Sequence, residues 1–247
     1  MTTVMKTSVA VTLFLIFNLA PLYAQTDRAT QISGDRTSLK HVFEDSIRLL
    51  AMQHSLRIGL QEKTRQELGG RFFSDYKRSV HMPHQWGDGD SELTNYGGHP
   101  GQGAASGFIW VQRDPSAPPS FVANRAYLHS RLRGMAFAAG YSLQFEIGPF
   151  SEASIGNVGL HPETAGWVDH VMTPIGGLAI MVGEDILDRF VVTRIEHRTD
   201  SVVLRAMSRM LLNPARATAN VAAVQAPWYR ADRPLRHIVV PSGLQRP

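Results

Sequence analysis

Apolar residues recur every three or four positions through most of the chain, the spacing that places them on one face of an α-helix. Turn formers such as Gly69-Gly70 and Asp114-Pro115 separate the periodic segments. No segment alternates between apolar and polar residues strongly enough to predict a β-strand. The pattern therefore predicts an all-α fold, an irregular helical bundle, with helices over residues 38–67, 100–113, 121–147, 166–197, 200–212 and a short one reaching 224.

The first 24 residues have the organisation of a secretory signal peptide. Lys6 precedes an apolar stretch from about Val9 to Leu22, and the small residue Ala24 follows at a cleavable position. The apolar stretch is shorter than the roughly 20 residues of a membrane-spanning helix. We therefore expect the mature protein to be exported, either periplasmic or associated with the outer membrane. Retention of the segment as an uncleaved anchor stays open.

Changes in composition divide the chain into four parts. Residues 1–24 are the predicted signal peptide, and residues 25–37 are polar and aperiodic, which predicts a flexible start. Residues 38–224 form the predicted helical domain. Residues 225–247 form a predicted extended tail, in which prolines alternate with the basic residues Arg230, Arg233, Arg236 and Arg246.

The charge of the chain is mild. It has 25 basic and 21 acidic residues, a formal net charge of +4, and no segment dense in lysine. Nucleic-acid binding is therefore not expected, because it requires a concentrated basic surface. Contact of the arginine-containing tail with a membrane or an envelope lipid stays open. The absence of cysteine excludes disulfides, thiolate metal ligands and a cysteine nucleophile.

Three of the predicted helices contain an uncharged stretch, each shorter than the roughly 20 residues that cross a bilayer. Two interpretations stay open: these are core helices of a soluble bundle, or the bundle sits in or against a membrane. Gly103 and Gly107 form a G-x-x-x-G pattern, which lets two helix backbones approach closely.

The candidate chemistry consists of one polar residue in or beside each uncharged stretch: His99, Glu146 and Asp169. A carboxylate inside an apolar helix needs a partner or stays protonated, because burying an isolated charge is costly. These three groups are therefore expected to meet in the interior. Three roles stay open: a hydrogen-bond network that fixes helix packing, a general acid/base set, and a His/carboxylate metal site.

Several further residues have narrower predicted roles. Glu152 competes with Glu146 for the acidic position and otherwise caps a short helix. Thr173 precedes Pro174, and its hydroxyl is expected to bond a carbonyl that the proline leaves free. Pro100 suits the first turn of a helix. Asp88-Gly89-Asp90 lacks the remaining ligands of a calcium loop and is predicted to be a turn. A solvated face is predicted for Glu184, Asp185 and Asp188 with Arg189.

The segment Asn95-Tyr96-Gly97-Gly98-His99-Pro100, followed by Gly103-Ala104, resembles the N-Y-x-G-H-P-x-x-G-A core of the DUF3943-type family of exported bacterial envelope proteins. The segments around Glu146 and Asp169 are similar to that family's other motifs, and the resemblance spans about residues 72–190. It implies helices and an envelope location, with Asn95 and Tyr96 as structural or loop residues, but no reaction. Gly97 and Gly101 stand where bulkier apolar residues are expected.

Two functions follow from these expectations. The first is a structural or binding module of the cell envelope at the membrane. The second is a hydrolase of an envelope lipid or glycan, with His99 as base and with Glu146 and Asp169 orienting it or holding a metal. The enzyme requires the three groups to lie together beside an open cleft, whereas a module allows them to be sealed. The sequence does not specify the metal, the cofactor or the protein partners.

Overall fold

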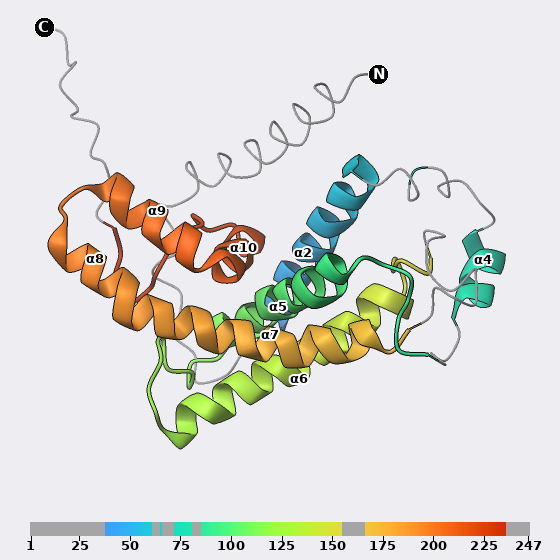
Figure 1. The fold of residues 1–247 in the computed structure, drawn as a ribbon, viewed down its shortest axis with the longest axis horizontal. Helices are drawn as coiled ribbons and strands as arrows, with labels where there is room; N and C mark the ends of the chain where they lie inside the picture. Colours follow the sequence, from blue (N-terminus) through green and yellow to red (C-terminus); the bar gives the residue numbers. More distant parts are fainter. Residues whose placement is uncertain (1–37, 61–64, 66–71, 81–84, 155–165, 236–247) are drawn as a thin grey trace, which may run out of the picture.

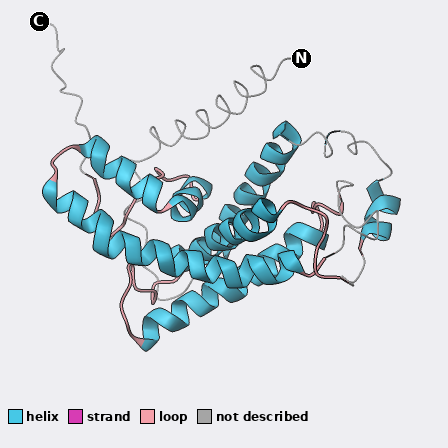
Figure 2. Cartoon of the chain, in the orientation of Figure 1, coloured by secondary structure: helices cyan, strands magenta, loops and turns pink. Residues whose placement is uncertain are grey.

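The computed structural model describes residues 38–60, 65, 72–80, 85–154 and 166–235. Figure 2 shows that this part of the chain consists of helices joined by loops, and its one β-type pairing is an isolated bridge between Gln85 and Gly166. The predicted all-α fold is confirmed. The predicted signal peptide, the flexible start at 25–37 and the end of the tail at 236–247 lie outside the described residues.

The observed helices follow the apolar periodicity closely. In chain order they are α2 (Leu39–Leu60), α4 (Phe72–Ser79), α5 (His99–Arg113), α6 (Arg125–Ile147), α7 (Val168–Leu187), α8 (Thr193–Arg198), α9 (Val202–Leu212) and α10 (Pro214–Ala222). Two π-helical turns, η2 (Thr94–Gly98) and η4 (Asp188–Val192), precede α5 and connect α7 to α8.

The predicted helix over 121–147 begins later than expected, at Arg125. Asn124 is extended, and its side-chain oxygen accepts a hydrogen bond of 2.8 Å from the backbone N–H of Tyr127. This bond satisfies one of the free donors at the start of the helix. The cap therefore sets the boundary, which periodicity alone does not locate.

Helices α5, α6 and α7 form the centre of the molecule, with α2 and α10 packed beside them (Figure 1). The centre is tight because glycines stand where the backbones cross. A Cβ atom on Gly103 would lie 1.7 Å from the carbonyl oxygen of Thr173, and one on Gly177 would lie 2.6 Å from the carbonyl carbon of Gly103. The G-x-x-x-G pattern thus brings α5 onto α7, as its spacing predicts.

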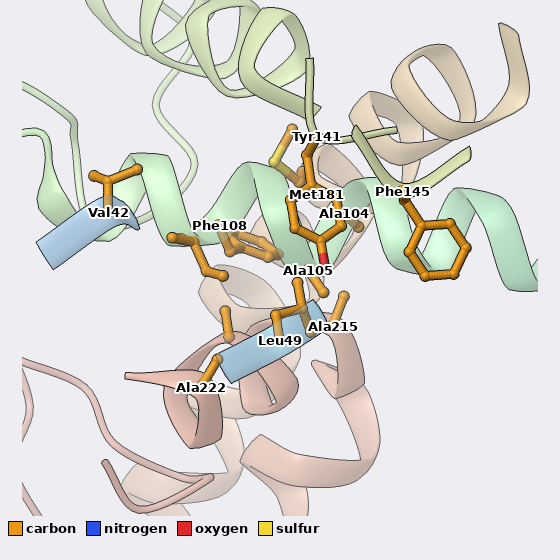
Figure 3. Packing of buried hydrophobic residues seen from close by; sticks show 12 residues of the cluster. Val42, Leu49, Ala104, Ala105, Phe108, Tyr141, Phe145, Met181, Ala215 and Ala222 are labelled. Atoms are coloured by element: carbon orange, nitrogen blue, oxygen red, sulfur yellow. The ribbon is translucent and has the colours of Figure 1, made fainter. Parts of the chain in front are cut away.

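The hydrophobic core lies where five helices meet. Figure 3 shows Leu49 of α2, Phe108 of α5, Tyr141 of α6, Met181 of α7 and Ala215 of α10 converging on one region. Phe108 and Met181 are fully buried. Each large apolar side chain that is buried in this way contributes about 1.5–3 kcal/mol relative to its exposed state.

The described part of the tail is not a solvated extension. Arg230 is 3% exposed, and its side chain donates to Asp188 Oδ1 at 3.2 Å and to Asn213 Oδ1 at 2.7 Å. Arg233 forms ion pairs with Asp188 and Glu196. The prediction of an extended tail is wrong for residues 225–235, because these arginines attach the segment to the end of α7.

The predicted solvated face on α7 is also wrong. Glu184 is 4% exposed, and Asp185 and Asp188 are fully buried. Helical spacing placed these acids on one side of α7, but it did not show that arginines from other elements cover that side. The acids are buried because each one has partners.

None of the helices in the described residues is both long enough and apolar enough to cross a bilayer.

Candidate functional site

Three helix ends bring His99, Glu146 and Asp169 together. His99 is the first residue of α5, Glu146 is the penultimate residue of α6, and Asp169 lies in the first turn of α7. All three side chains are buried, with exposed fractions of 6%, 3% and 6%. The start of a helix favours a carboxylate at Asp169, because the macrodipole is positive there.

The three side chains lie close to one another without satisfying one another. His99 Nε2 is 3.1 Å from Asp169 Oδ1, and His99 Nδ1 is 4.0 Å from Glu146 Oε1. One nitrogen or oxygen from each residue lies within 4.8 Å of the other two. Nevertheless His99 Nδ1, Glu146 Oε1 and Asp169 Oδ1 are buried atoms with no hydrogen-bond partner among the described residues. Such unsatisfied atoms are rare in folded proteins and call for an explanation.

The charges around the two acids are mostly negative. Burial raises the pKa of Asp169, and the nearby charges that raise it further are those of Glu146, Asp88 and Asp90. Burial also raises the pKa of Glu146, which has Arg57 as a compensating charge against Asp88 and Asp90. The raised pKa values favour the protonated form of both acids in the empty site, and a cation that binds there would displace their protons.

The imidazole of His99 is neutral at pH 7, because burial lowers its pKa to about 4. A neutral imidazole has one nitrogen with a free lone pair, which can bind a metal or accept a proton. His99 is therefore in the protonation state that either role requires.

Asp88 is the residue of this region that the sequence analysis did not select. Its side chain shares a hydrogen bond with Asp169 and accepts another, at 2.9 Å, from the side-chain amide of Asn95. The predicted turn exists, since Asp88 also accepts from the backbone N–H of Asp90 at 3.1 Å. The signal was available, because Asp88 lies in the same loop as Asn95 and His99.

A backbone connection places Asp88 beside α7. The backbone N–H groups of Trp167 and Val168 donate to the carbonyls of Gln85 and Trp86 at 3.0 and 2.9 Å. Gly166 is required at this crossing, because a Cβ there would lie 2.5 Å from the carbonyl carbon of Gly87. The loop therefore enters the site by pairing with the start of α7.

Two other predicted site residues stand near His99. Asn95 is buried, and its side-chain oxygen has no partner among the described residues. Pro100 occupies the first turn of α5, as predicted, and packs against Gly176. Both residues hold the start of α5 in place.

The remaining predicted residues lie outside the cluster. Tyr96 is exposed, and its hydroxyl accepts a hydrogen bond of 3.0 Å from Trp86. Glu152 forms an ion pair with Arg57 and so does not replace Glu146. The hydroxyl of Thr173 is buried without a partner in the described part of the chain, so the predicted bond to a carbonyl near Pro174 is wrong.

A cavity of about 550 Å³ opens beside the cluster. His99 is part of its lining, together with residues of α2, α5 and α10. This volume lies within the roughly 300–1,000 Å³ that is usual for small-molecule sites. The buried cluster therefore adjoins, through His99, a space that a ligand can occupy, whereas Glu146 and Asp169 are not part of its lining.

One imidazole and two carboxylates are a common donor set for a divalent metal ion. Ligand atoms bound to one ion at about 2.1 Å lie at most roughly 4.2 Å apart. The longest separation here, 4.8 Å, needs a contraction that side-chain rotation can supply. Three protein ligands leave coordination positions free for water or substrate, as in catalytic rather than structural metal sites.

No protein-family model, no curated protein and no solved structure matches this chain. The resemblance to the DUF3943-type proteins therefore stays a prediction, and the interpretation of the site depends on its geometry.

Proposed function

We propose that this protein is a divalent-metal-dependent hydrolase of the cell envelope, acting on a lipid or a glycan. The observation that carries the proposal is the buried cluster of His99, Glu146 and Asp169, which offers one ligand atom from each residue within 4.8 Å and includes three atoms without a hydrogen bond among the described residues. The envelope location depends on the signal-peptide pattern of residues 1–24 and stays a prediction.

The geometry fits a hydrolase better than a structural module. A network that pins three helices has its polar atoms hydrogen-bonded, because unsatisfied buried groups cost stability. Here His99 Nδ1 and Glu146 Oε1 have no hydrogen bond within the described residues, Asp169 Oδ1 has only His99 Nε2 nearby at 3.1 Å, and the adjacent cavity gives a substrate access to His99.

Each residue of the cluster would have its own role in the hydrolysis. A bound divalent ion would polarise a water molecule and a substrate oxygen. Glu146 and Asp169 would supply the negative charge that retains the ion. His99, neutral at pH 7, has one nitrogen with a free lone pair, which would either bind the ion or accept the proton of the attacking water. Asp88 would orient Asp169 through their shared hydrogen bond.

Metal binding by the purified protein tests the proposal. We expect one Zn²⁺ or Mn²⁺ ion per chain by calorimetry and elemental analysis, with a stabilisation of about 2.7 kcal/mol at 100 times the Kd. His99→Ala, Glu146→Gln and Asp169→Asn should each abolish this stabilisation. His129→Ala, which removes an exposed histidine of α6, is the matched control and should bind normally.

The same proteins test hydrolysis. Chromogenic acetate esters and N-acetylglucosaminides should distinguish an ester hydrolase from a glycosidase, and turnover should fall by about 100-fold or more in Asp169→Asn. A protein that binds no ion, or one in which all four variants behave alike, would overturn the proposal in favour of a structural module.

A further inference from the structure

The cavity beside His99 has mostly apolar walls. Its lining includes Leu49, Met52 and Leu56 of α2, Ala105 of α5 and Ala215 of α10. Such a lining recognises a ligand by the apolar area that it removes from water.

Three of the charged side chains in the lining have partners within the fold. Arg57 and Glu152 pair with each other. Glu184 accepts hydrogen bonds of 2.7 and 3.0 Å from the backbone N–H groups of Ala215 and Arg216. These three groups are therefore already engaged, and together with the mostly apolar walls this favours a neutral, apolar occupant.

Glycines leave the space beside His99 open. Gly97, Gly98 and Gly101 belong to the cavity lining. A Cβ on Gly101 would meet no atom within 4 Å, and one on Gly97 would first meet Leu93 at 3.5 Å. Larger side chains at these positions would fit the backbone but would occupy the cavity.

One free donor stands at the same end. Gln102 lies one turn after His99 on α5, in the lining of the cavity. Its side-chain nitrogen is buried and has no hydrogen-bond partner among the described residues. An uncharged carbonyl oxygen is a suitable acceptor for this amide.

We propose that the cavity binds the acyl chain of a neutral ester amphiphile, with its ester carbonyl between Gln102 and His99. The inference rests on the proposed hydrolase and selects a lipid over a glycan as substrate. In the reaction the oxygen of water bonds to the carbonyl carbon and the bond from that carbon to the alcohol oxygen breaks. One water proton passes to the alcohol oxygen, so the products are a carboxylic acid and an alcohol.

Binding without turnover separates this inference from the proposed reaction. Metal-free full-length protein is loaded with N-phenylnaphthylamine, a neutral fluorescent apolar probe, and titrated with glyceryl monobutyrate, monooctanoate and monolaurate. Affinity should rise about three- to fourfold for each added methylene until the cavity is filled. Gly101→Leu should weaken octanoate and laurate binding by about tenfold or more and change butyrate binding little.

Gly140→Leu is the matched control. Gly140 is an exposed glycine inside α6, and a Cβ there also meets no atom within 4 Å. Both substitutions replace a helical glycine with a better helix former, so both should fold. Gly101→Ala is a second, smaller change and should give an intermediate loss, which guards against misfolding of the leucine variant.

The outcomes are distinct. Equal displacement by all three esters, equal behaviour of Gly101→Leu and Gly140→Leu, or displacement by N-acetylglucosamine oligomers instead would overturn the acyl-chain inference. If binding depends on chain length but the metal-loaded protein hydrolyses no ester, the acyl-chain site is supported and the proposed reaction is overturned. If metal binding is lost in Asp169→Asn but no ester binds, the proposed metal site is supported and the acyl-chain inference is overturned.

Discussion

Helix α7 carries buried acids at both ends, Asp169 in its first turn and Asp185 in its last. Asp185 accepts hydrogen bonds from Arg131 at 2.7 Å and from the hydroxyl of Tyr127 at 2.8 Å, and it pairs with Arg216. Asp169 is surrounded by negative charges, and its Oδ1 has no hydrogen-bond partner among the described residues.

The difference shows how burial should be interpreted. Both acids are hidden from water, so burial alone does not separate a structural role from a functional one. Charge pairing distinguishes the two roles, because a buried charge that only stabilises the fold must have an opposite charge within the fold. Asp185 is paired in this way. The acidic groups at Asp169 and Glu146 would instead be compensated by a bound cation.

The largest expected effect is a contrast in stability between the two ends of α7. Arg131→Met should cost about 3–5 kcal/mol, because it removes one of the partners of the buried Asp185. Asp169→Asn should cost little, because burial already raises the pKa of Asp169 to about 9 and the amide replaces a neutral carboxyl group. Urea unfolding of both variants in the presence of EDTA measures the difference. If Asp169→Asn is as damaging as Arg131→Met, the cluster is a structural network.

Glu184 is an intermediate case. Burial raises its pKa to about 7, although backbone hydrogen bonds from Ala215 and Arg216 lower it. The folded state thus keeps a proton that the unfolded state releases near pH 4.5, so this stabilisation is present below about pH 4.5 and is lost as pH rises through 7. Relative to Glu184→Gln, the wild type should lose about 3 kcal/mol between these pH values.

Urea midpoints at a series of pH values measure this effect, and the difference between the two proteins cancels the titration of all other groups. Parallel curves would show that the proton on Glu184 is not linked to folding. Glu184 would then belong with Asp185, as a fully compensated acid.

The smallest expected effect concerns the loop that reaches α7. Asp88→Asn keeps a hydrogen-bonding side chain beside Asp169 but removes its charge, so it should weaken metal binding by about tenfold. Calorimetric titration with Zn²⁺ measures the change. Asp232→Asn, which removes an exposed ion-pair partner of Arg233, is the control. Unchanged affinity in Asp88→Asn would show that Asp88 only closes its turn.

The ionic cluster at the far end of α7 also explains why the tail prediction was wrong. Arg230 and Arg233 look in sequence like arginines of a solvated, proline-containing tail. Their partners, Asp188 and Glu196, lie about 40 residues earlier in the chain. Contacts over that separation leave no periodic signal, and each partner alone looks like a surface residue.

The sequence by itself determined the helices and the identity of the three groups that meet. Helical periodicity is local, and it located α5, α6 and the start of α7 within a few residues, although the helix predicted over 166–197 is divided into α7, η4 and α8. The cost of burying an acid in an uncharged helix is also readable locally, and it selected His99, Glu146 and Asp169. The structure brings these three together, while their catalytic role stays a prediction.

The tertiary structure alone decided which buried acids are compensated. Asp88 enters the site through backbone pairing between Gln85 and Trp167, and Asp185 acquires arginines from α6 and α10. Electrostatic compensation depends on distances between residues that are remote in sequence, so composition and spacing do not reveal it. The same reason applies to the cavity beside His99, whose walls come from five separate helices, α2, α5, α6, α7 and α10.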